Sequence, residues 1–206
     1  HYETRGTPEN PTLVLLHGFL GNLRDWAEIA ERLADTFHVV SIDLPGHGKS
    51  LDIDADITYT MPTTSLSIIR ILDRLDIRSF AVAGYSMGAR IALHLAATYS
   101  ARVFAAIIES GTPGIASESE RAERRAYDAA LSLELEMGSL ADVLARWYDR
   151  PLFDTFRQHP RFQEQFQRRL ANDRPQVARA LRQLGTGSQP NLWPLLPDYS
   201  VPTLAL

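Results

Sequence analysis

Short apolar runs recur along this chain, and each one is followed by a turn that contains glycine. They cover residues 12–16, 38–43, 80–83 and 103–108. Runs of this length with few polar positions are typical of strands that are covered on both faces, as the strands of a parallel sheet are. Stretches with apolar residues at helical spacing separate them. The pattern therefore predicts an α/β fold, with helices on both faces of a mostly parallel sheet.

The helices between these strands are predicted from the same kind of spacing. Asn22 is a suitable N-cap for a helix over residues 23–34, where apolar residues recur on one face. A second helix is expected to begin after Pro62, and a third is expected over residues 89–99. The order of elements is then strand, helix, strand, helix, strand, helix and strand.

The pattern changes after residue 114. Residues 115–190 are rich in Arg, Glu, Leu and aromatic residues, show helical spacing and contain no convincing strand. We interpret them as a helical cap inserted between residues 1–114, the first part of the α/β core, and residues 191–206, where the core resumes. Residues 201–206 are expected to form a strand, and we expect the rest of the core to follow position 206.

One motif suggests catalysis. Gly84-x-Ser86-x-Gly88 lies between a predicted buried strand and a predicted helix. In this context it is typical of a nucleophile elbow, a tight turn that holds the serine hydroxyl clear of the backbone. The backbone amide of Met87 then points toward a developing oxyanion, and the amide of Phe19, after the first buried strand, can supply a second donor. Ser86 is the predicted catalytic residue, and the two amides form the predicted oxyanion hole.

No histidine of the sequence is expected to be the base for this serine. We expect His17 to bond the backbone of a strand-ending turn, and His47 to be a loop residue. His94 lies within the predicted helix of the elbow and His159 within the cap. In proteins whose catalytic serine lies on a nucleophile elbow, the acid and then the histidine follow the serine in the chain. The acid and the histidine are therefore expected beyond Leu206.

Composition and motifs argue against several other functions. The net charge of −4 disfavours a general nucleic-acid surface, and the absence of Cys excludes a thiolate metal site and a disulfide scaffold. Residues 43–50 end in Gly-Lys-Ser, but Asp43 stands where a nucleotide-binding loop needs glycine. No apolar run approaches the roughly 18 residues of a membrane span. We therefore expect a cytoplasmic protein with no metal, no cofactor and no membrane span.

Four longer motifs narrow the interpretation. They are Tyr-Ser-Met-Gly-Ala-Arg at 85–90, Glu-Ser-Gly-Thr-Pro-Gly at 109–114, Arg-Ala-Glu-Arg-Arg at 121–125 and Trp-Tyr-Asp-Arg-Pro-Leu-Phe at 147–153. Together they resemble the 2-succinyl-6-hydroxy-2,4-cyclohexadiene-1-carboxylate synthases of menaquinone and phylloquinone biosynthesis, which belong to the α/β-hydrolase superfamily. The resemblance covers nearly the whole chain, and the two cap motifs are its most specific part.

The resemblance implies a lyase that eliminates pyruvate from a compact polyanion, 2-succinyl-5-enolpyruvyl-6-hydroxy-3-cyclohexene-1-carboxylate. Ser86 would abstract a proton through a His–Asp pair and would not carry an acyl group. An arginine fork matches a carboxylate, so arginines are expected to hold the carboxylates of the substrate. The residues that the resemblance places around the substrate are Tyr85, Arg90, Arg124, Trp147, Phe153 and Arg168.

Ordinary structural roles stay open for the cap residues. Arg124 could pair with Glu120 or Asp128, Arg168 could pair with Glu164, and the two aromatic residues could form the cap core. Two other functions also stay open: a C–C bond or ester hydrolase of the same fold, and a non-catalytic ligand-binding protein. Release of pyruvate, as opposed to consumption of water, would separate the lyase from the hydrolase.

Overall fold

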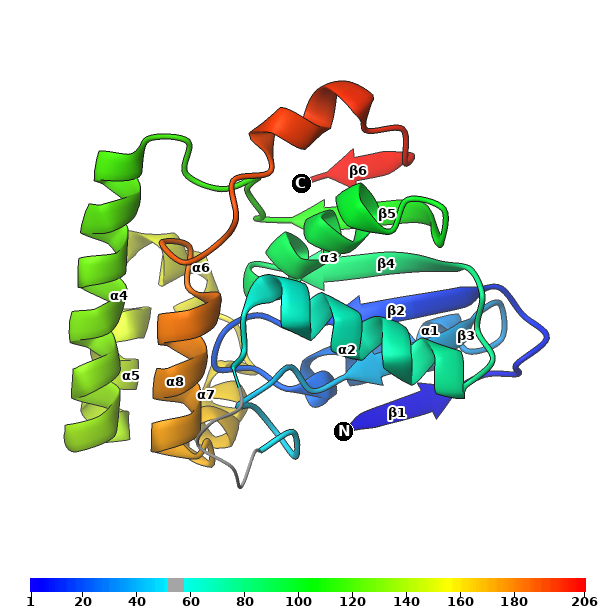
Figure 1. The fold of residues 1–206 in the computed structure, drawn as a ribbon. Helices are drawn as coiled ribbons and strands as arrows, with labels where there is room; N and C mark the ends of the chain where they lie inside the picture. The colour runs from blue at the N-terminus through cyan, green and yellow to red at the C-terminus, as the bar shows by residue number, and fades with distance from the viewer. Residues whose placement is uncertain (52–57) are drawn as a thin grey trace.

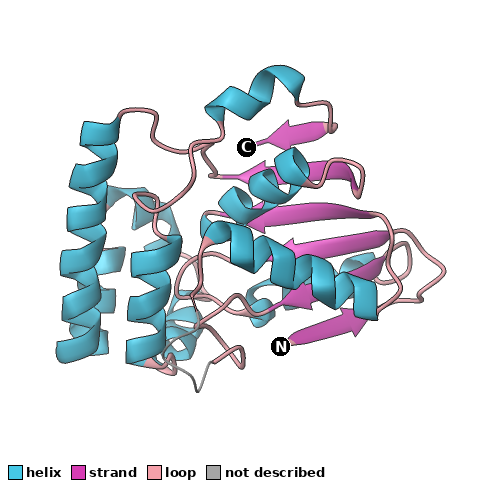
Figure 2. Cartoon of the chain, in the orientation of Figure 1, coloured by secondary structure: helices cyan, strands magenta, loops and turns pink. Residues whose placement is uncertain are grey.

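The computed structural model describes residues 1–51 and 58–206. Six strands form one sheet in the order β1-β3-β2-β4-β5-β6 (Figures 1 and 2). All neighbouring strands are parallel except β1 and β3, which are antiparallel. The strands are β1 (Tyr2–Arg5), β2 (Thr12–Leu16), β3 (His38–Ile42), β4 (Phe80–Tyr85), β5 (Val103–Glu109) and β6 (Thr203–Ala205). The predicted α/β fold with a mostly parallel sheet is confirmed.

Strand β1 was not among the predicted elements. It is a short edge strand with mostly exposed side chains, and it pairs Tyr2 with Ile42 and Arg5 with Val39. A polar segment of this kind has neither the apolar run of a buried strand nor a clear alternation of period two. Its strand conformation comes from pairing with β3, which the local sequence does not reveal.

The helices of the core follow the predicted order with shifted ends. The expected helix over residues 23–34 is a 3₁₀ turn, η1 (Leu23–Trp26), followed by α1 (Ala27–Leu33). The Asn22 side chain caps the turn by accepting a hydrogen bond from the amide of Arg24. Helix α2 (Met61–Arg74) begins just before Pro62, and α3 (Met87–Thr98) begins directly after Ser86.

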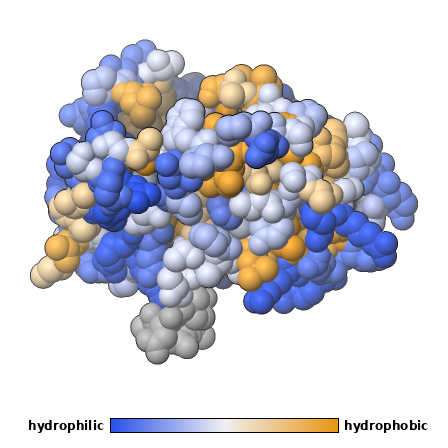
Figure 3. Space-filling view, turned by 45° about the horizontal axis from the view of Figure 1, so that its top comes forward, coloured by the Kyte–Doolittle hydropathy of each residue, from blue (hydrophilic) through white to orange (hydrophobic). Residues whose placement is uncertain are grey.

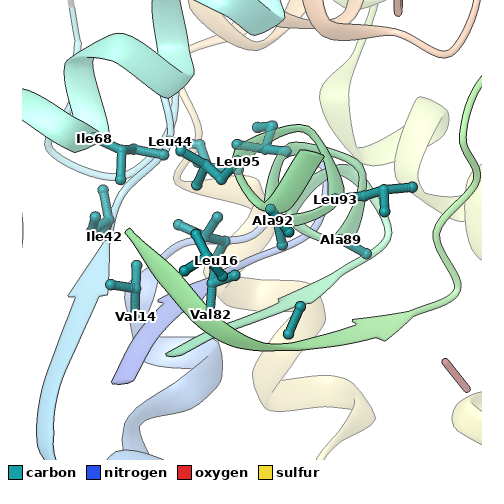
Figure 4. Packing of buried hydrophobic residues seen from close by; sticks show 14 of the residues in the cluster. Val14, Leu16, Ile42, Leu44, Ile68, Val82, Ala89, Ala92, Leu93 and Leu95 are labelled. Carbon is teal, nitrogen blue, oxygen red and sulfur yellow. The ribbon is translucent and has the colours of Figure 1, made fainter. Parts of the chain in front are cut away.

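The two faces of the sheet bury alternate residues of the same strands. Val14 and Leu16 belong to the larger core cluster, which includes residues of α2 and α3 (Figure 4). Leu13 and Leu15 belong to a second cluster that includes Ala30 of α1. This alternation explains why the strand is apolar at every position, because successive side chains point to opposite faces. The predicted helices on both faces are confirmed.

Residues 115–190 are helical, with no strand, as expected. The helices in this range are α4 (Glu118–Met137), α5 (Leu140–Tyr148), η2 (Pro151–Phe153), α6 (Asp154–Arg157), α7 (Phe162–Leu170) and α8 (Arg174–Leu184). They lie together beside the end of the sheet to which the parallel strands point (Figure 1). We call residues 115–190 the cap, and the division of the chain into a core and a cap stays a prediction. A further 3₁₀ helix, η3 (Trp193–Asp198), leads to β6.

The cap helices share an apolar cluster of their own. Its buried residues include Leu135 of α4, Leu144 of α5 and Val177 of α8, and Leu20 of the core joins them. On the face seen in Figure 3, hydrophilic residues cover most of the surface and apolar patches are scattered between them. No helix in the described part of the chain is long and apolar enough to span a bilayer.

Candidate active site

Ser86 lies at the junction of β4 and α3 in a strained backbone conformation. Its φ is 52° and its ψ is −107°, a region that non-glycine residues rarely adopt. Its amide donates to the carbonyl oxygen of Glu109 at 2.9 Å, and its carbonyl accepts from the amide of Arg90 at 3.1 Å. These two bonds hold the residue between the end of β5 and the first turn of α3. The strand, turn and helix of a nucleophile elbow are all present.

The glycines on each side of Ser86 are required by close packing of the backbone. A Cβ atom at position 84 would lie 2.3 Å from the carbonyl oxygen of Gly88. A Cβ atom at position 88 would lie 2.2 Å from the carbonyl oxygen of Leu16 in β2. Both atoms are backbone, so neither clash can be relieved by a side-chain rotation. The spacing of the motif is thus explained by the turn itself.

The loop after β2 lies directly against the elbow. A Cβ atom at Gly18 would be 2.7 Å from Cδ1 of Tyr85 and 3.5 Å from Cβ of Ser86. Phe19 follows this contact, and Met87 is the first residue of α3. Within the described residues, neither the amide of Phe19 nor that of Met87 donates a hydrogen bond. Both amides are free to bind an oxyanion, and their assignment to an oxyanion hole stays a prediction.

His17 and His47 are structural, because both nitrogens of each ring are engaged. In His17, Nδ1 donates to the carbonyl oxygen of Gly18 at 2.7 Å and Nε2 accepts from the amide of Leu44 at 2.9 Å. In His47, Nδ1 donates to the carbonyl oxygen of Pro45 at 3.0 Å and Nε2 accepts from the amide of Leu20 at 3.2 Å. Each ring is fixed as a neutral tautomer that supports the loops around the elbow.

Burial reinforces this neutral state. It lowers the pKa of His17 to about 4, against the opposing effects of its bond to Gly18 and the charge of Asp43. It also lowers the pKa of His47 to about 3, and the neighbouring His17 adds to that shift. Rings that stay neutral and fully bonded do not serve as the base for Ser86.

The two histidines that follow Ser86 in the chain also lie elsewhere. Nδ1 of His94 is 2.9 Å from the hydroxyl of Ser65 inside the core, and His159 is exposed in the cap, where Nδ1 accepts from the amide of Arg161. In the described part of the chain, the Ser86 hydroxyl has no hydrogen bond to any histidine. That the base lies beyond Leu206 stays a prediction.

Aromatic side chains from the cap reach the loop beside Ser86. The ring of Trp147 lies 5.6 Å from that of Phe19, edge to face, and 6.3 Å from that of Phe153. Both cap residues are half-buried and also pack against the apolar cluster of the cap. The structure therefore brings together Phe19, Trp147 and Phe153. Trp147 and Phe153 can pack in the cap core and also face a substrate, so the two predicted roles are compatible. Their contact with substrate stays a prediction.

Tyr85, the last residue of β4, lies near several charged residues. Its side chain is 36% exposed, and partial burial together with the charge of Glu109 raises the pKa of its hydroxyl. The positive charges of Arg169 and Arg150 oppose that shift. Two cap arginines thus act on the residue that precedes Ser86.

Arg90 is buried where the core meets the cap. One of its terminal nitrogens donates to the carbonyl oxygen of Leu184 at 2.8 Å and to Oε1 of Gln189 at 3.3 Å. Burial, and to a smaller extent the charge of Arg124, lowers its pKa to about 10, against the opposing effect of the Asp128 charge. The guanidinium stays charged at neutral pH and donates to neutral oxygens, while Asp128 pairs with Arg124. Arg90, Arg124 and Asp128 together therefore carry an excess positive charge.

Arg124 and Arg168 both have acidic partners. Nε of Arg124 donates to Oδ1 of Asp128 at 2.8 Å, which is one of the pairings left open above. Arg168 lies 3.6 Å from Glu164 and 3.3 Å from Asp25 of the core. Its Nε is buried and has no partner among the described residues. Neither pairing excludes a substrate role, because each guanidinium keeps further donors.

The core partners of α7 were not predicted. Asp25 accepts from Arg168 and from Arg169, and Arg169 also donates to the hydroxyl of Tyr148 and to the carbonyl oxygen of Leu20. An acid in a short helix and adjacent arginines in another helix look like ordinary surface residues in a sequence. Only the folded chain places them at one junction beside the elbow.

Comparison with known proteins is consistent with this geometry. Residues 11–200 match the model of the alpha/beta hydrolase fold. The 2-succinyl-6-hydroxy-2,4-cyclohexadiene-1-carboxylate synthase of Serratia proteamaculans is 34% identical over 98% of this chain and 78% of its own length. The chloroplast protein PHYLLO of Arabidopsis thaliana is 34% identical over 92% of this chain.

A solved structure shows the same relationship. MenH from S. aureus superposes with a TM-score of 0.92 at 36% identity, over 100% of this chain and 78% of that protein. The chain spans about three quarters of the Serratia and S. aureus proteins and only 12% of PHYLLO. The chain belongs to the alpha/beta hydrolase fold family and, within it, to the 2-succinyl-6-hydroxy-2,4-cyclohexadiene-1-carboxylate synthases.

Proposed function

We propose that the protein releases pyruvate from 2-succinyl-5-enolpyruvyl-6-hydroxy-3-cyclohexene-1-carboxylate, with Ser86 as the residue that takes the proton. The observation that carries the proposal is the strained Ser86 at the elbow, with the free amides of Phe19 and Met87 beside it, in a chain of this family. The synthase name describes the relatives, and the elbow is the feature of this chain that fits their reaction.

The bond changes follow from a comparison of the cyclohexene ring of the substrate with the cyclohexadiene ring of the product. Substrate carbon C2 lies next to the succinyl carbonyl and loses a proton, and the electron pair forms the C2–C3 double bond. The former C3–C4 double bond moves to C4–C5, the C5–O bond breaks, and the leaving enolate takes up a proton to become pyruvate. Negative charge develops on the succinyl oxygen during proton loss. Two preorganised amides at that oxygen stabilise the transition state more than the ground state.

The charged groups around the elbow suit a substrate with three carboxylates. We propose that Arg90, Arg124 and Arg168 hold these groups, while Tyr85, Trp147 and Phe153 pack against the ring and the succinyl chain. Support comes from the excess positive charge of the Arg90–Arg124–Asp128 cluster and from the buried, unpartnered Nε of Arg168. The expected cytoplasmic location, and a reaction without metal or cofactor, stay predictions of the sequence.

The experiment measures pyruvate with lactate dehydrogenase as the coupling enzyme, using the protein as its gene encodes it. The expected result is pyruvate release by the wild type and a loss of about 10²- to 10⁴-fold in kcat for Ser86→Ala, because a proton-transfer group is removed. Ser110→Ala is a matched control, since this serine also has a positive φ and follows β5. Turnover of short acyl esters without pyruvate would favour the hydrolase. Near-full activity of Ser86→Ala would show that the elbow is structural.

A further inference from the structure

Arg150 lies in the turn between α5 and η2 and is stacked on two aromatic rings. Its guanidinium carbon is 3.8 Å from the centre of the Trp147 ring and 5.2 Å from that of Phe153. Its Nε donates to the carbonyl oxygen of Trp147 at 3.0 Å. Stacking and this hydrogen bond together fix the plane of the guanidinium.

The outer edge of this guanidinium is open. In the described part of the chain, no carboxylate lies within ion-pair distance of Arg150, and its two terminal nitrogens donate no hydrogen bond. Its neighbours along the chain differ, since Arg146 pairs with Glu134 and Arg157 pairs with Asp149 and Asp154. A half-buried, oriented cation whose terminal donors are unused is suited to bind an anion that is not part of the chain.

The position of Arg150 relates it to the elbow. It lies on Trp147, which contacts Phe19 in the loop that packs on Tyr85 and Ser86. Its charge is also one of those that act on the Tyr85 hydroxyl. A cavity of about 170 Å³ between α4 and α5 is lined by Arg150 and Trp147 together with Tyr127. Arg150 thus lines this cavity and is linked to the loop beside the elbow through Trp147.

We propose that Arg150 binds a carboxylate of the substrate through its two terminal nitrogens and so contributes to substrate specificity. The inference rests on the proposed function, because the anion it assigns is part of that polyanionic substrate. Arg90, Arg124 and Arg168 already donate to protein oxygens, whereas the outer edge of Arg150 is open. Trp147 supports the guanidinium and leaves that edge free, so the geometry suits a bidentate contact.

The test compares Arg150→Gln with Arg146→Gln in the pyruvate assay. Arg146 is a matched control, because it lies one turn earlier in α5, is exposed and pairs with Glu134. Loss of a charge-assisted hydrogen bond corresponds to a rise in KM of about 10- to 100-fold for Arg150→Gln. We expect kcat to change by less than about threefold, since the contact is made in the ground state as well as in the transition state. Arg146→Gln is expected to keep both constants.

Two further variants separate charge recognition from packing. Arg150→Met keeps an apolar side chain over Trp147 and removes the charge, and Arg150→Lys keeps the charge without the fork. We expect Arg150→Met to match Arg150→Gln in KM, and Arg150→Lys to recover only part of the loss. A wild-type KM in Arg150→Met would show that Arg150 acts through packing and would overturn the inference. This comparison holds even where Arg150→Gln lowers the melting temperature.

The outcomes also separate this inference from the proposed function. If the wild type releases pyruvate and Arg150→Gln keeps the wild-type KM, the inference is wrong and the function stands. If the wild type releases no pyruvate and hydrolyses esters, the proposed function fails and the assignment of Arg150 fails with it. A raised KM for Arg150→Gln alone, beside an unchanged Arg146→Gln, supports both.

Discussion

Arg169 of the cap donates a hydrogen bond to the carboxylate of Asp25 in the core at 3.1 Å. The side chains are 11% and 17% exposed, and Arg168 shares the same carboxylate. Arg169 also donates to the carbonyl oxygen of Leu20, one residue after Phe19. A single acid of the core therefore holds two consecutive arginines of α7 beside the loop that is predicted to bind the oxyanion.

We expect Asp25→Asn to destabilise the protein more than a surface substitution does. Removal of one partner from a largely buried ion pair leaves uncompensated charge, at a cost of about 3 kcal/mol of unfolding free energy. For a chain of this length, that cost corresponds to a fall of roughly 6–12 °C in Tm. Thermal unfolding followed by circular dichroism measures it. Asp35→Asn is the control, since Asp35 is exposed. Equal melting temperatures for the two variants would mean that Asp25 does not hold the cap.

The elbow was predictable from the sequence, whereas this junction was not. Residues 80–88 carry a strand, a turn and the start of a helix, so their conformation depends mainly on neighbours in the chain. Asp25 and Arg169 are brought together only when the cap packs on the core, and nothing near either residue marks the other. The same reason explains why β1 was missed, since its partner β3 supplies the hydrogen bonds.

The roles of the predicted substrate-binding residues also depend on contacts that the sequence does not reveal. The motifs indicated which arginines to consider, but they did not indicate that Arg90 donates to the carbonyl oxygen of Leu184 or that Arg150 has an open edge. Those differences depend on which oxygen atoms lie nearby in three dimensions. Sequence patterns identify residue types at chemical sites, and the packing of the cap decides which donors stay available.

The unfolding free energy is expected to fall as the pH is lowered from 7 to 5. Burial lowers the pKa values of His17 and His47 to about 4 and about 3, so below about pH 6.5 the unfolded chain binds protons that the folded chain does not. Stability therefore rises with pH across this range and is fully present above it. Each histidine contributes at most about 1.4 kcal/mol per pH unit, a slope that is approached once the unfolded ring is protonated.

Urea unfolding at a series of pH values checks this dependence. The variant His47→Gln is expected to be less stable at pH 7, since two hydrogen bonds are altered, and to have a smaller histidine-dependent slope, because His17 and the buried His94 still contribute. His159→Gln serves as the control, because His159 is exposed in the cap. A wild-type midpoint that does not change between pH 7 and pH 5 would show that both rings are protonated in the fold without penalty.

Gly18→Ala is expected to reduce activity through the Tyr85 ring. The new Cβ atom would lie 2.7 Å from Cδ1 of Tyr85, which must move, and the amide of Phe19 would shift with the loop. Small displacements of groups at the reacting centre can cost about 10²-fold in rate, so we expect a fall of about 10- to 100-fold in kcat. The pyruvate assay measures it.

A double-mutant cycle with Tyr85→Ala tests the cause of that loss. If the ring causes the strain, Gly18→Ala has little further effect once the ring is removed, and the two changes are strongly non-additive. Additive losses would instead place the effect in the loop backbone. Full activity of Gly18→Ala in the wild-type background would show that the loop is not part of the catalytic geometry.

The arginines distinguish a polyanion-specific lyase from a general hydrolase. Loss of Arg124 or Arg168 is expected to cost roughly 2–4 kcal/mol of transition-state binding, which is a fall of about 30- to 1,000-fold in kcat/KM. Arg→Lys should recover only part of it, because an ammonium lacks the bidentate fork. Arg32 is the control, since it is 75% exposed and its pairing with Glu28 contributes at most about 1 kcal/mol.

Stability must be measured on the same samples, because Arg124 also pairs with the buried Asp128. A loss of activity in Arg124→Lys with an unchanged melting temperature would assign the effect to substrate binding. If Arg124→Ala and Arg168→Ala behaved like Arg32→Ala in kcat/KM, these cap arginines would not bind carboxylates. The assigned substrate would then be abandoned, while the fold and the elbow would remain, since both rest on backbone geometry that these side chains do not determine.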